Sequence, residues 1–251
     1  MEPLIRGRYC ARLAADEADI RAAQALRWQA FRVKRGLGDD GGLDADAWDA
    51  VCAHVLVEDR ATGALVCCYR LLAMSDGDQI DRCYSAQYYN LAALRRYRGP
   101  MVEMGRFCLR PGVTDPNVMR LAWAAMGRFV EAQKVELLFG CSSFMGTEVA
   151  AYEDAFAMLK DRHLAPRRWL PRVKAPDVFR FARLLARRKP DDRKALLSMP
   201  PLLRSYLAMG GWVSDHAVVD RDLNTLHVFT GLEIAAIPPA RVKTLTGLAV
   251  G

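Results

Sequence analysis

Hydrophobic and polar positions alternate between strand-like and helix-like periods over the first 160 residues. Apolar runs bounded by turn residues predict strands at residues 8–13, 53–58, 64–72, 101–109 and 135–141. Helical periods predict helices at residues 16–32, 88–97, 117–133 and 148–159. Strands and helices mixed in this order predict an α/β or α+β fold, with one mixed central sheet flanked by helices.

The last third of the chain has a different pattern. Residues 160–204 carry 14 Lys and Arg against four Asp and Glu, together with six prolines. We predict an irregular basic appendage with one amphipathic helix at residues 177–188, before strand character returns at 217–219 and 226–229. The expected organisation is a core over residues 1–160 and a basic, Pro-rich extension over 161–251 that packs on it.

Composition narrows the class of protein. The chain has 251 residues and a net charge of +7, which favours anionic partners such as nucleic acid, a membrane surface or an acidic protein. Its seven cysteines show no C-x-x-C spacing, which is typical of reduced thiols in a cytoplasmic protein. Neither a secretion signal nor a membrane-spanning stretch is visible, so a cytoplasmic location is expected.

An acid-rich loop follows the first predicted helix. Five Asp fall within residues 39–49, and Trp48 lies among them. Such a cluster can hold a cationic ligand. The alternative is a solvated loop whose carboxylates cap turns, and the residues alone favour that alternative.

Charged residues also interrupt two apolar strands. Arg70 ends one strand, while Glu103 and Arg106 lie in a later one. Residues three apart point to opposite faces of a regular strand, but a bulge at Gly105 would bring them to one face. Glu103 could then serve as a general base, and Arg106 or Arg70 could bind a carboxylate. A structural Glu–Arg pair explains the same residues, and both interpretations stay open.

Several well-known site motifs are missing. The four histidines form no H-E-x-x-H pattern, so we predict no metal site, and only His54, next to the acid-rich loop, is a weak site candidate. Gly-rich phosphate loops are also missing, and the turn at residues 110–115 lacks the pyrophosphate loop of acetyl-CoA enzymes. This argues against ordinary coenzyme A binding. Ser142 and Ser143 are interpreted as loop residues, and Cys141 is given no catalytic role.

The basic segment allows three kinds of partner: DNA, membrane phosphates or an acidic protein. Nucleic acid has the least support, because no helix-turn-helix, zinc finger or aromatic RNA motif is present. A basic amphipathic helix suits a membrane surface or an acidic protein, and a solvated helix packed on the core is the simpler alternative. The candidate contact residues are Arg167, Arg168, Arg172, Lys174, Arg180, Arg183, Arg187 and Arg188.

Taken together, the motifs resemble a known family. The N-terminal ones are Arg27-x-x-x-Phe31, Asp46-x-x-Asp49, Cys52-x-His54, Tyr69-Arg70 and Glu103-x-Gly105-Arg106-Phe107. Further matches extend through residues 140–144, 163–166 and 200–213. This pattern resembles the bacterial L-ornithine Nα-acyltransferases. The N-terminal half is more distantly similar to acyl-homoserine lactone synthases.

The resemblance implies an N-acetyltransferase-like (GNAT) fold and a direct acyl transfer. The donor would be a 3-hydroxyacyl thioester on acyl carrier protein, the acceptor the α-amine of ornithine and the product lyso-ornithine lipid, with no further cofactor. Glu103 and Arg106 match the catalytic acid–base region, while Arg27, Phe31, Asp46, Asp49 and Arg70 match substrate-binding positions. By chemistry, Asp46 and Asp49 suit the amines of ornithine and Arg70 or Arg106 its carboxylate. The basic segment suits acidic carrier protein, or a peripheral contact with the inner membrane.

Other functions stay open at this stage. The same reaction could use glutamine or lysine as acceptor. A lactone-type synthase would use S-adenosylmethionine, but residues 33–38 lack the Trp that such enzymes carry after their Phe. A basic protein that binds membrane or nucleic acid is the non-enzymatic alternative.

Overall fold

The computed structural model describes residues 1–33, 36 and 41–239. Asp39 and Asp40 of the acid-rich loop lie outside the described residues. Contacts within the chain define two compact units. Residues 1–73 and 104–135 belong to the first unit, and residues 74–103 and 136–238 belong to the second. These are not the segments 1–160 and 161–251 that charge and proline content separate, and that division stays a prediction.

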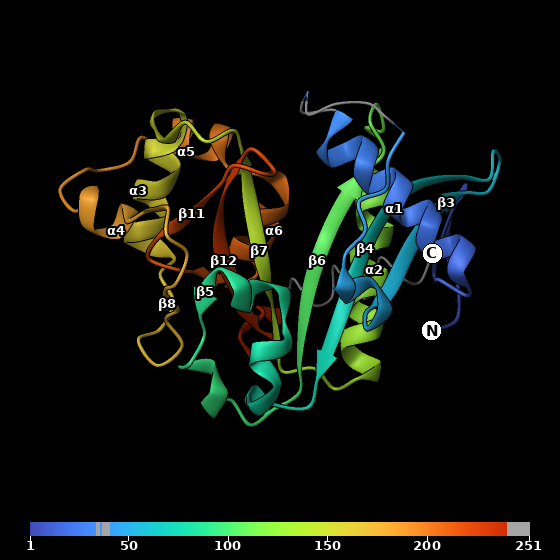
Figure 1. Ribbon diagram of the computed structural model, residues 1–251, viewed down its shortest axis with the longest axis horizontal. Coiled ribbons are helices and arrows are strands. Elements are labelled where there is room, and N and C mark those ends of the chain that lie inside the picture. The colour runs from blue at the N-terminus through green and yellow to red at the C-terminus, as the bar shows by residue number, and fades with distance from the viewer. Residues whose placement is uncertain (34–35, 37–40, 240–251) are drawn as a thin grey trace. The chain divides into compact units, whose positions relative to one another are not determined.

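The first unit is a sheet with one helix on each face (Figure 1). Its strand order is β1-β2-β3-β4-β6. The strands are β1 (Leu4–Arg6), β2 (Tyr9–Leu13), β3 (Ala53–Asp59), β4 (Ala64–Met74) and β6 (Met101–Leu109), and only the part of β6 from residue 104 belongs to this unit. The helices are α1 (Glu17–Phe31) and α2 (Pro116–Ala132), with a short 3-10 helix η2 (Ala47–Ala50) before β3.

The alternation of β4 determines which helix covers which face. Cys68 lies in an apolar cluster with Leu26 of α1 and Cys108 of β6. The next residue, Tyr69, donates a hydrogen bond of 2.8 Å to the Ala122 carbonyl of α2. Successive strand residues point to opposite faces, so α1 covers the face of Cys68 and α2 covers the face of Tyr69. Arg70 therefore points to the α1 side.

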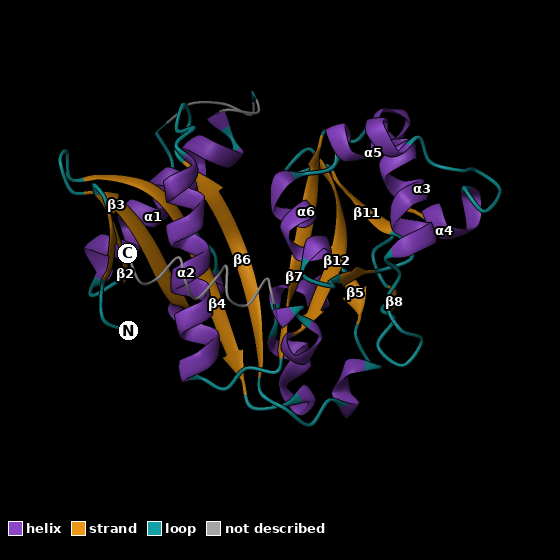
Figure 2. Cartoon of the chain, turned by 180° about the vertical axis from the view of Figure 1, so that it is seen from behind, coloured by secondary structure: helices purple, strands orange, loops and turns teal. Residues whose placement is uncertain are grey.

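The second unit is built around long antiparallel pairing (Figure 2). β7 (Leu137–Met145) pairs with β12 (Thr225–Glu233) along its whole length and runs parallel to residues 101–103 of β6. The order continues through β11 (Ala217–Asp220) to β9 (Val178–Phe179), and β10 (Trp212–Val213) also pairs with β12. A separate two-stranded sheet joins β5 (Tyr89–Asn90) and β8 (Arg172–Val173).

Three of the helices that cover one face of strands β7 and β12 are the longest in this unit. They are α3 (Glu153–Arg162), α5 (Asp192–Ser198) and α6 (Pro201–Ala208). Phe144 of β7 and Val228 of β12 are buried with Phe156 of α3 and Leu203 of α6. The remaining elements are α4 (Phe181–Leu184) and the 3-10 helices η3 (Gly77–Arg82), η4 (Tyr84–Gln87), η5 (Leu94–Arg96), η6 (Val149–Tyr152) and η7 (Ile234–Ala236).

Three local predictions are wrong. Residues 88–97 form β5 and η5 in place of a helix, and residues 177–188 form β9 and the short α4. Val178 pairs with Val218, a distant partner that the local periodicity does not show. Ser142 and Ser143 lie inside β7 rather than in a loop, because β12 extends the pairing to Met145.

Candidate functional site

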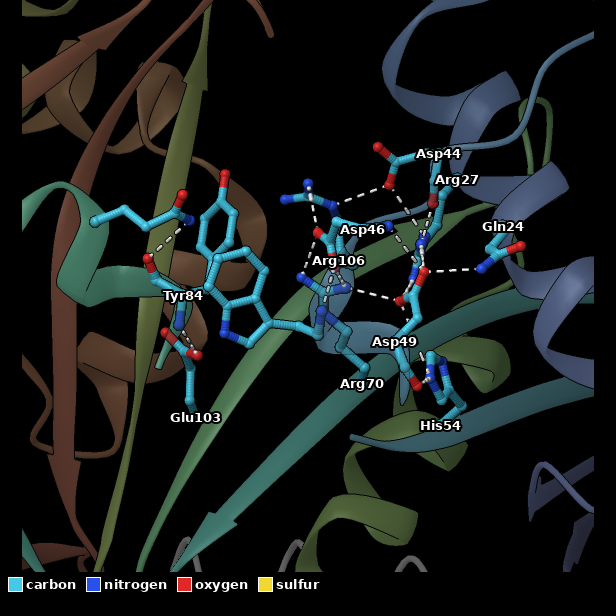
Figure 3. A network of polar contacts seen from close by, with 12 residues as sticks. Gln24, Arg27, Asp44, Asp46, Asp49, His54, Arg70, Tyr84, Glu103 and Arg106 are labelled. Carbon is cyan, nitrogen blue, oxygen red and sulfur yellow. Dashed lines mark hydrogen bonds and ion pairs between the residues drawn. The ribbon is translucent and has the colours of Figure 1, made fainter. Parts of the chain in front are cut away.

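Six charged residues of the first unit form one connected group, which we call the acid–arginine network. Its members are Arg27, Asp44, Asp46, Asp49, Arg70 and Arg106, as Figure 3 shows. The guanidinium groups come from α1, β4 and β6, and the carboxylates come from the loop before β3 and from η2.

The Asp46-x-x-Asp49 motif is a local helix cap. Asp46 is the N-cap of η2, and its side chain accepts a hydrogen bond of 3.0 Å from the Trp48 amide. The Asp49 side chain accepts one of 3.3 Å from the Asp46 amide. This reciprocal capping box fixes the spacing of the two carboxylates and presents both to the sheet.

Asp49 lies at the centre of the network. Arg27 donates to both of its oxygens at 2.7 Å, and Arg70 donates at 2.7 Å. Gln24 adds a hydrogen bond of 2.9 Å. Arg27 also donates to the Asp44 carbonyl, and its Nε lies 3.0 Å from an Asp44 carboxylate oxygen as an ion pair without hydrogen-bond alignment.

The outer part of the network is more exposed. Arg70 binds both oxygens of Asp46, at 2.5 and 2.8 Å. Arg106 donates hydrogen bonds of 2.9 Å to Asp44 and 3.2 Å to Asp46. The side chains of Asp46 and Arg106 are 20% and 13% exposed, whereas that of Arg27 is 1% exposed. An incoming ligand would therefore meet Asp46 and Arg106 first.

Burial and ion pairing act in opposite directions on these carboxylates. Burial alone would raise the pKa of Asp49, but hydrogen bonds from Arg27 and Gln24 outweigh it and hold the pKa well below its ordinary value. Burial alone would also raise the pKa of Asp46, but the hydrogen bond from Arg70 and the nearby positive charges outweigh it, so this pKa is lowered as well. Asp46 and Asp49 are therefore ionised at neutral pH, and guanidinium groups face both of them.

His54 is a buried neighbour of this network and contacts the backbone of Asp49. Its Nε2 lies 2.9 Å from the Asp49 carbonyl oxygen. Burial lowers the pKa of the imidazole, so His54 is neutral near pH 7. Phe31, the last residue of α1, packs against the apolar cluster of Leu26 and Leu56.

Arg106 has an unusual backbone. Its φ is +55°, in the left-handed region of backbone conformation that residues with a Cβ rarely adopt. The sequence suggested an irregularity at Gly105, but Arg106 itself is the left-handed residue. Such a conformation costs on the order of 1 kcal/mol and is often kept where it positions a functional side chain.

Glu103 lies in the second unit and has a separate set of partners. Its carboxylate accepts a hydrogen bond of 2.8 Å from the Tyr84 amide (Figure 3). It also accepts hydrogen bonds from Ser85, from the amide at 2.7 Å and from the hydroxyl at 2.5 Å. Sequence reasoning missed Tyr84 and Ser85. The only usable signal was Glu103 itself, because a carboxylate buried in an apolar strand requires donors from elsewhere in the chain.

The basic segment belongs to the second unit, and its eight candidate residues are exposed. Arg188 pairs with Glu153 and Asp154 of α3, and Lys174 donates to the Ala86 carbonyl. Arg168 lies 3.5 Å from Glu233. Within residues 41–239, the remaining candidates have no ion pair, and these are Arg167, Arg172, Arg180, Arg183 and Arg187.

Across the described residues, no group of three or more His, Cys, Asp and Glu side chains is arranged to hold a metal ion. No helix in the same part of the chain has the length and apolar character to cross a membrane.

Comparisons with known proteins identify the fold. Residues 26–124 match the acetyltransferase (GNAT) domain family. A solved N-acyl amino acid synthase, FeeM, from uncultured soil microbes superposes with a TM-score of 0.51 at 11% identity, covering 91% of this chain and 93% of that one. A coenzyme A-dependent acyl-homoserine lactone synthase, BjaI, gives 0.51 at 13% identity, covering 94% and 86%. The expected GNAT fold, a mixed sheet flanked by helices, is confirmed.

Sequence relatives are more specific. The chain is 35% identical over 239 residues to the L-ornithine N(alpha)-acyltransferase of Rhodobacter capsulatus, covering 91% of each chain. It is 32% identical to the enzyme of the same name from Agrobacterium fabrum, covering 90% of this chain and 81% of that one. The resemblance drawn from the motifs is confirmed, and the chain belongs to the L-ornithine Nα-acyltransferase family.

Proposed function

We propose that this protein transfers a 3-hydroxyacyl group from acyl carrier protein to the α-amine of L-ornithine, giving lyso-ornithine lipid. The observation that carries the proposal is the 31–35% identity, over about 90% of the chain, to relatives named L-ornithine N(alpha)-acyltransferase. The carrier-bound donor is the finer part of the proposal. Its support is the missing pyrophosphate loop and the basic segment, which would attract an acidic carrier.

The acid–arginine network suits a zwitterionic acceptor. Attack requires a neutral α-amine, so bound ornithine presents one ammonium and one carboxylate. Asp46 would bind the ammonium and Arg106 the carboxylate. This exchanges one ion pair for two and leaves the charge of the network balanced. The buried Arg27–Asp49–Arg70 group would hold the outer pair in position.

Glu103 is the proposed general base. The α-amine attacks the thioester carbonyl carbon, and Glu103 accepts the proton that the nitrogen loses, directly or through water. The tetrahedral intermediate then collapses, the C–S bond breaks and the amide remains. The three hydrogen bonds to Glu103 stabilise its charged form, which is the form that can accept a proton.

A donor–acceptor matrix tests this function. Purified protein is incubated with 3-hydroxyacyl carrier protein or the matching coenzyme A thioester, each with ornithine, lysine, glutamine or S-adenosylmethionine, and products are identified by mass spectrometry. We expect acyl-ornithine, formed fastest from the carrier-bound donor. Acyl-lysine or acyl-glutamine as the main product would show that the acceptor is a different amino acid, and a lactone would favour the synthase alternative. Faster reaction with the coenzyme A thioester would contradict the proposal that the donor is bound to acyl carrier protein.

The basic segment is proposed to bind the carrier. Reversing two unpaired charges, in the Arg183→Glu/Arg187→Glu variant, should raise KM for the carrier-bound donor about tenfold, with kcat unchanged, because electrostatic attraction contributes mainly to encounter. Arg128→Glu, which changes an exposed residue of α2 in the other unit, is the control for charge alone. Equal KM values for the double variant and the wild type would contradict this role, and sedimentation with anionic vesicles would show a membrane contact instead.

A further inference from the structure

Glu103, Ser85 and Cys141 of the second unit form a chain of polar contacts, of which the proposed reaction uses only Glu103. The parallel pairing of β6 with β7 places Glu103 opposite Phe139. Residues two apart share a strand face, so Cys141 lies on the same face as Glu103, one step further along β7. The Ser85 hydroxyl oxygen is 2.5 Å from the Glu103 carboxylate and 3.4 Å from the Cys141 sulfur.

Simple valence assigns the protons along this chain. A serine hydroxyl carries one proton and a carboxylate carries none, so the short contact is a hydrogen bond donated by Ser85 to Glu103. The remaining lone pairs of Ser85 can only accept, and the Cys141 thiol therefore donates to Ser85. The direction of donation is Cys141 to Ser85 to Glu103. Ser85 is completely buried, whereas Cys141 is half-buried.

The proposed acyl transfer requires a proton at each end of this chain. The attacking amine loses a proton and the departing thiolate must gain one. We propose that Cys141 is the general acid that protonates the leaving sulfur, and that Ser85 passes a proton from Glu103 to Cys141 to restore both groups. This inference rests on the proposed function and deepens it.

The step balances in atoms and charge. The amine proton goes to Glu103 as the nitrogen–carbon bond forms. When the carbon–sulfur bond breaks, its electron pair stays on the leaving sulfur, which takes the Cys141 proton. Ser85 then gives its proton to the Cys141 thiolate and receives the one held by Glu103. Cysteine and the departing alkyl thiol have similar acidity, so the transfer between them costs little driving force.

The same geometry argues against Cys141 as a nucleophile. A thiolate attacks carbonyl carbon, whereas a thiol does so poorly. The hydrogen bond from Cys141 to Ser85 requires the thiol form. A proton donor is the role that this protonation state supports.

The dependence of the rate on the leaving group tests the relay. Cys141→Ala and wild type are assayed with an acyl-pantetheine thioester and with the matching aryl thioester, whose thiolate departs without an acid. Loss of a general acid should lower kcat about 10²-fold with the pantetheine donor. With the aryl donor the two proteins should differ less than about threefold, because proton donation no longer limits the rate.

Control variants separate chemistry from structure. Ser143→Ala changes an exposed residue two positions along the same strand face and should leave both rates unchanged. Ser85→Thr keeps the hydroxyl and should retain more activity with the pantetheine donor than Ser85→Ala does. Thermal unfolding of each variant shows whether it is folded.

Two results would overturn the relay alone. One is an equal loss of rate with both donors in Cys141→Ala, which marks a structural role. The other is an acyl group on Cys141 in the intact mass of wild-type protein. A wild type that acylates no acceptor from either donor, nor from carrier protein, would overturn the proposed function and the relay with it.

Discussion

Asp49→Asn tests whether the acid–arginine network holds the first unit together. The change keeps the shape of the side chain but removes one of three carboxylates from a site where Asp49 is 6% exposed. Arg27 and Arg70 would then share an excess positive charge in a buried place. Breaking a buried ion pair by removing one partner costs about 3–5 kcal/mol.

The assay is denaturant and thermal unfolding of the full chain. For a protein of this size, about 1 kcal/mol corresponds to roughly 2–4 °C, so the melting temperature should fall by about 6–20 °C. Glu58→Gln is the matched control, because Glu58 is 28% exposed and its partner Arg12 keeps Asp19. We expect that control to cost less than about 1 kcal/mol. An Asp49→Asn variant as stable as the control would show that the ion pairs of Asp49 do not stabilise the first unit.

The effect of Asp49→Asn should depend on pH. The pKa of Asp49 is lower in the folded protein than the ordinary value of about 3.9 that applies to the unfolded chain. Between those two values the unfolded chain binds more protons, so this stabilisation is complete above about pH 5 and decreases as pH falls through the window. The stability difference between wild type and variant should therefore be constant from about pH 5 to 8 and shrink below about pH 4. A difference that grows on acidification would contradict this sign.

Three further substitutions test individual residues. Asp46→Asn should raise KM for ornithine about tenfold or more while kcat changes less, since a carboxylate bound to the acceptor ammonium contributes about 1.5–3 kcal/mol; steady-state kinetics with varied ornithine measures this, and an unchanged KM would place the ammonium elsewhere. Gly127→Ala should stabilise the protein by about 0.5–1 kcal/mol, because Gly127 lies inside α2 with nothing within 4 Å of an added Cβ. Gly77→Ala should destabilise it, since the same atom would collide with the Leu94 carbonyl. Unfolding curves measure the stability of the two glycine variants. Changes in stability of the same sign for Gly127→Ala and Gly77→Ala would contradict these two predictions.

Strong periodic patterns predicted much of the fold. The strand at residues 101–109 has the predicted bounds, and the helix at 117–133 differs from α2 by one residue at each end. Both are long segments whose burial pattern repeats over several turns or pairs. The helix predicted at residues 177–188 is wrong, because residues 178–179 take their conformation from pairing with β11, a partner about 40 residues away. A local window does not contain that information.

Five of the six charged residues of the acid–arginine network belong to the family motifs, all except Asp44, but the motifs do not show how these residues are arranged. By chemistry, Asp46 and Asp49 were assigned to the amines of ornithine, and Arg70 or Arg106 to its carboxylate. The structure shows them bound to one another, because buried charges require partners whether or not a ligand is present. Ser85 was missed altogether, since its contact with Glu103 depends on how η4 lies on the second sheet, and no spacing in the chain records it.

The most direct test of the account is the position of the acyl group in the product. Wild-type protein and Glu103→Ala are given 3-hydroxyacyl carrier protein with equimolar ornithine, lysine and glutamine, and the products are fragmented in a mass spectrometer. We expect one main product from wild type, ornithine acylated on its α-nitrogen, and its loss in the Glu103→Ala variant. Acylation on the δ-nitrogen, a different preferred amino acid, or full activity without Glu103 would contradict it.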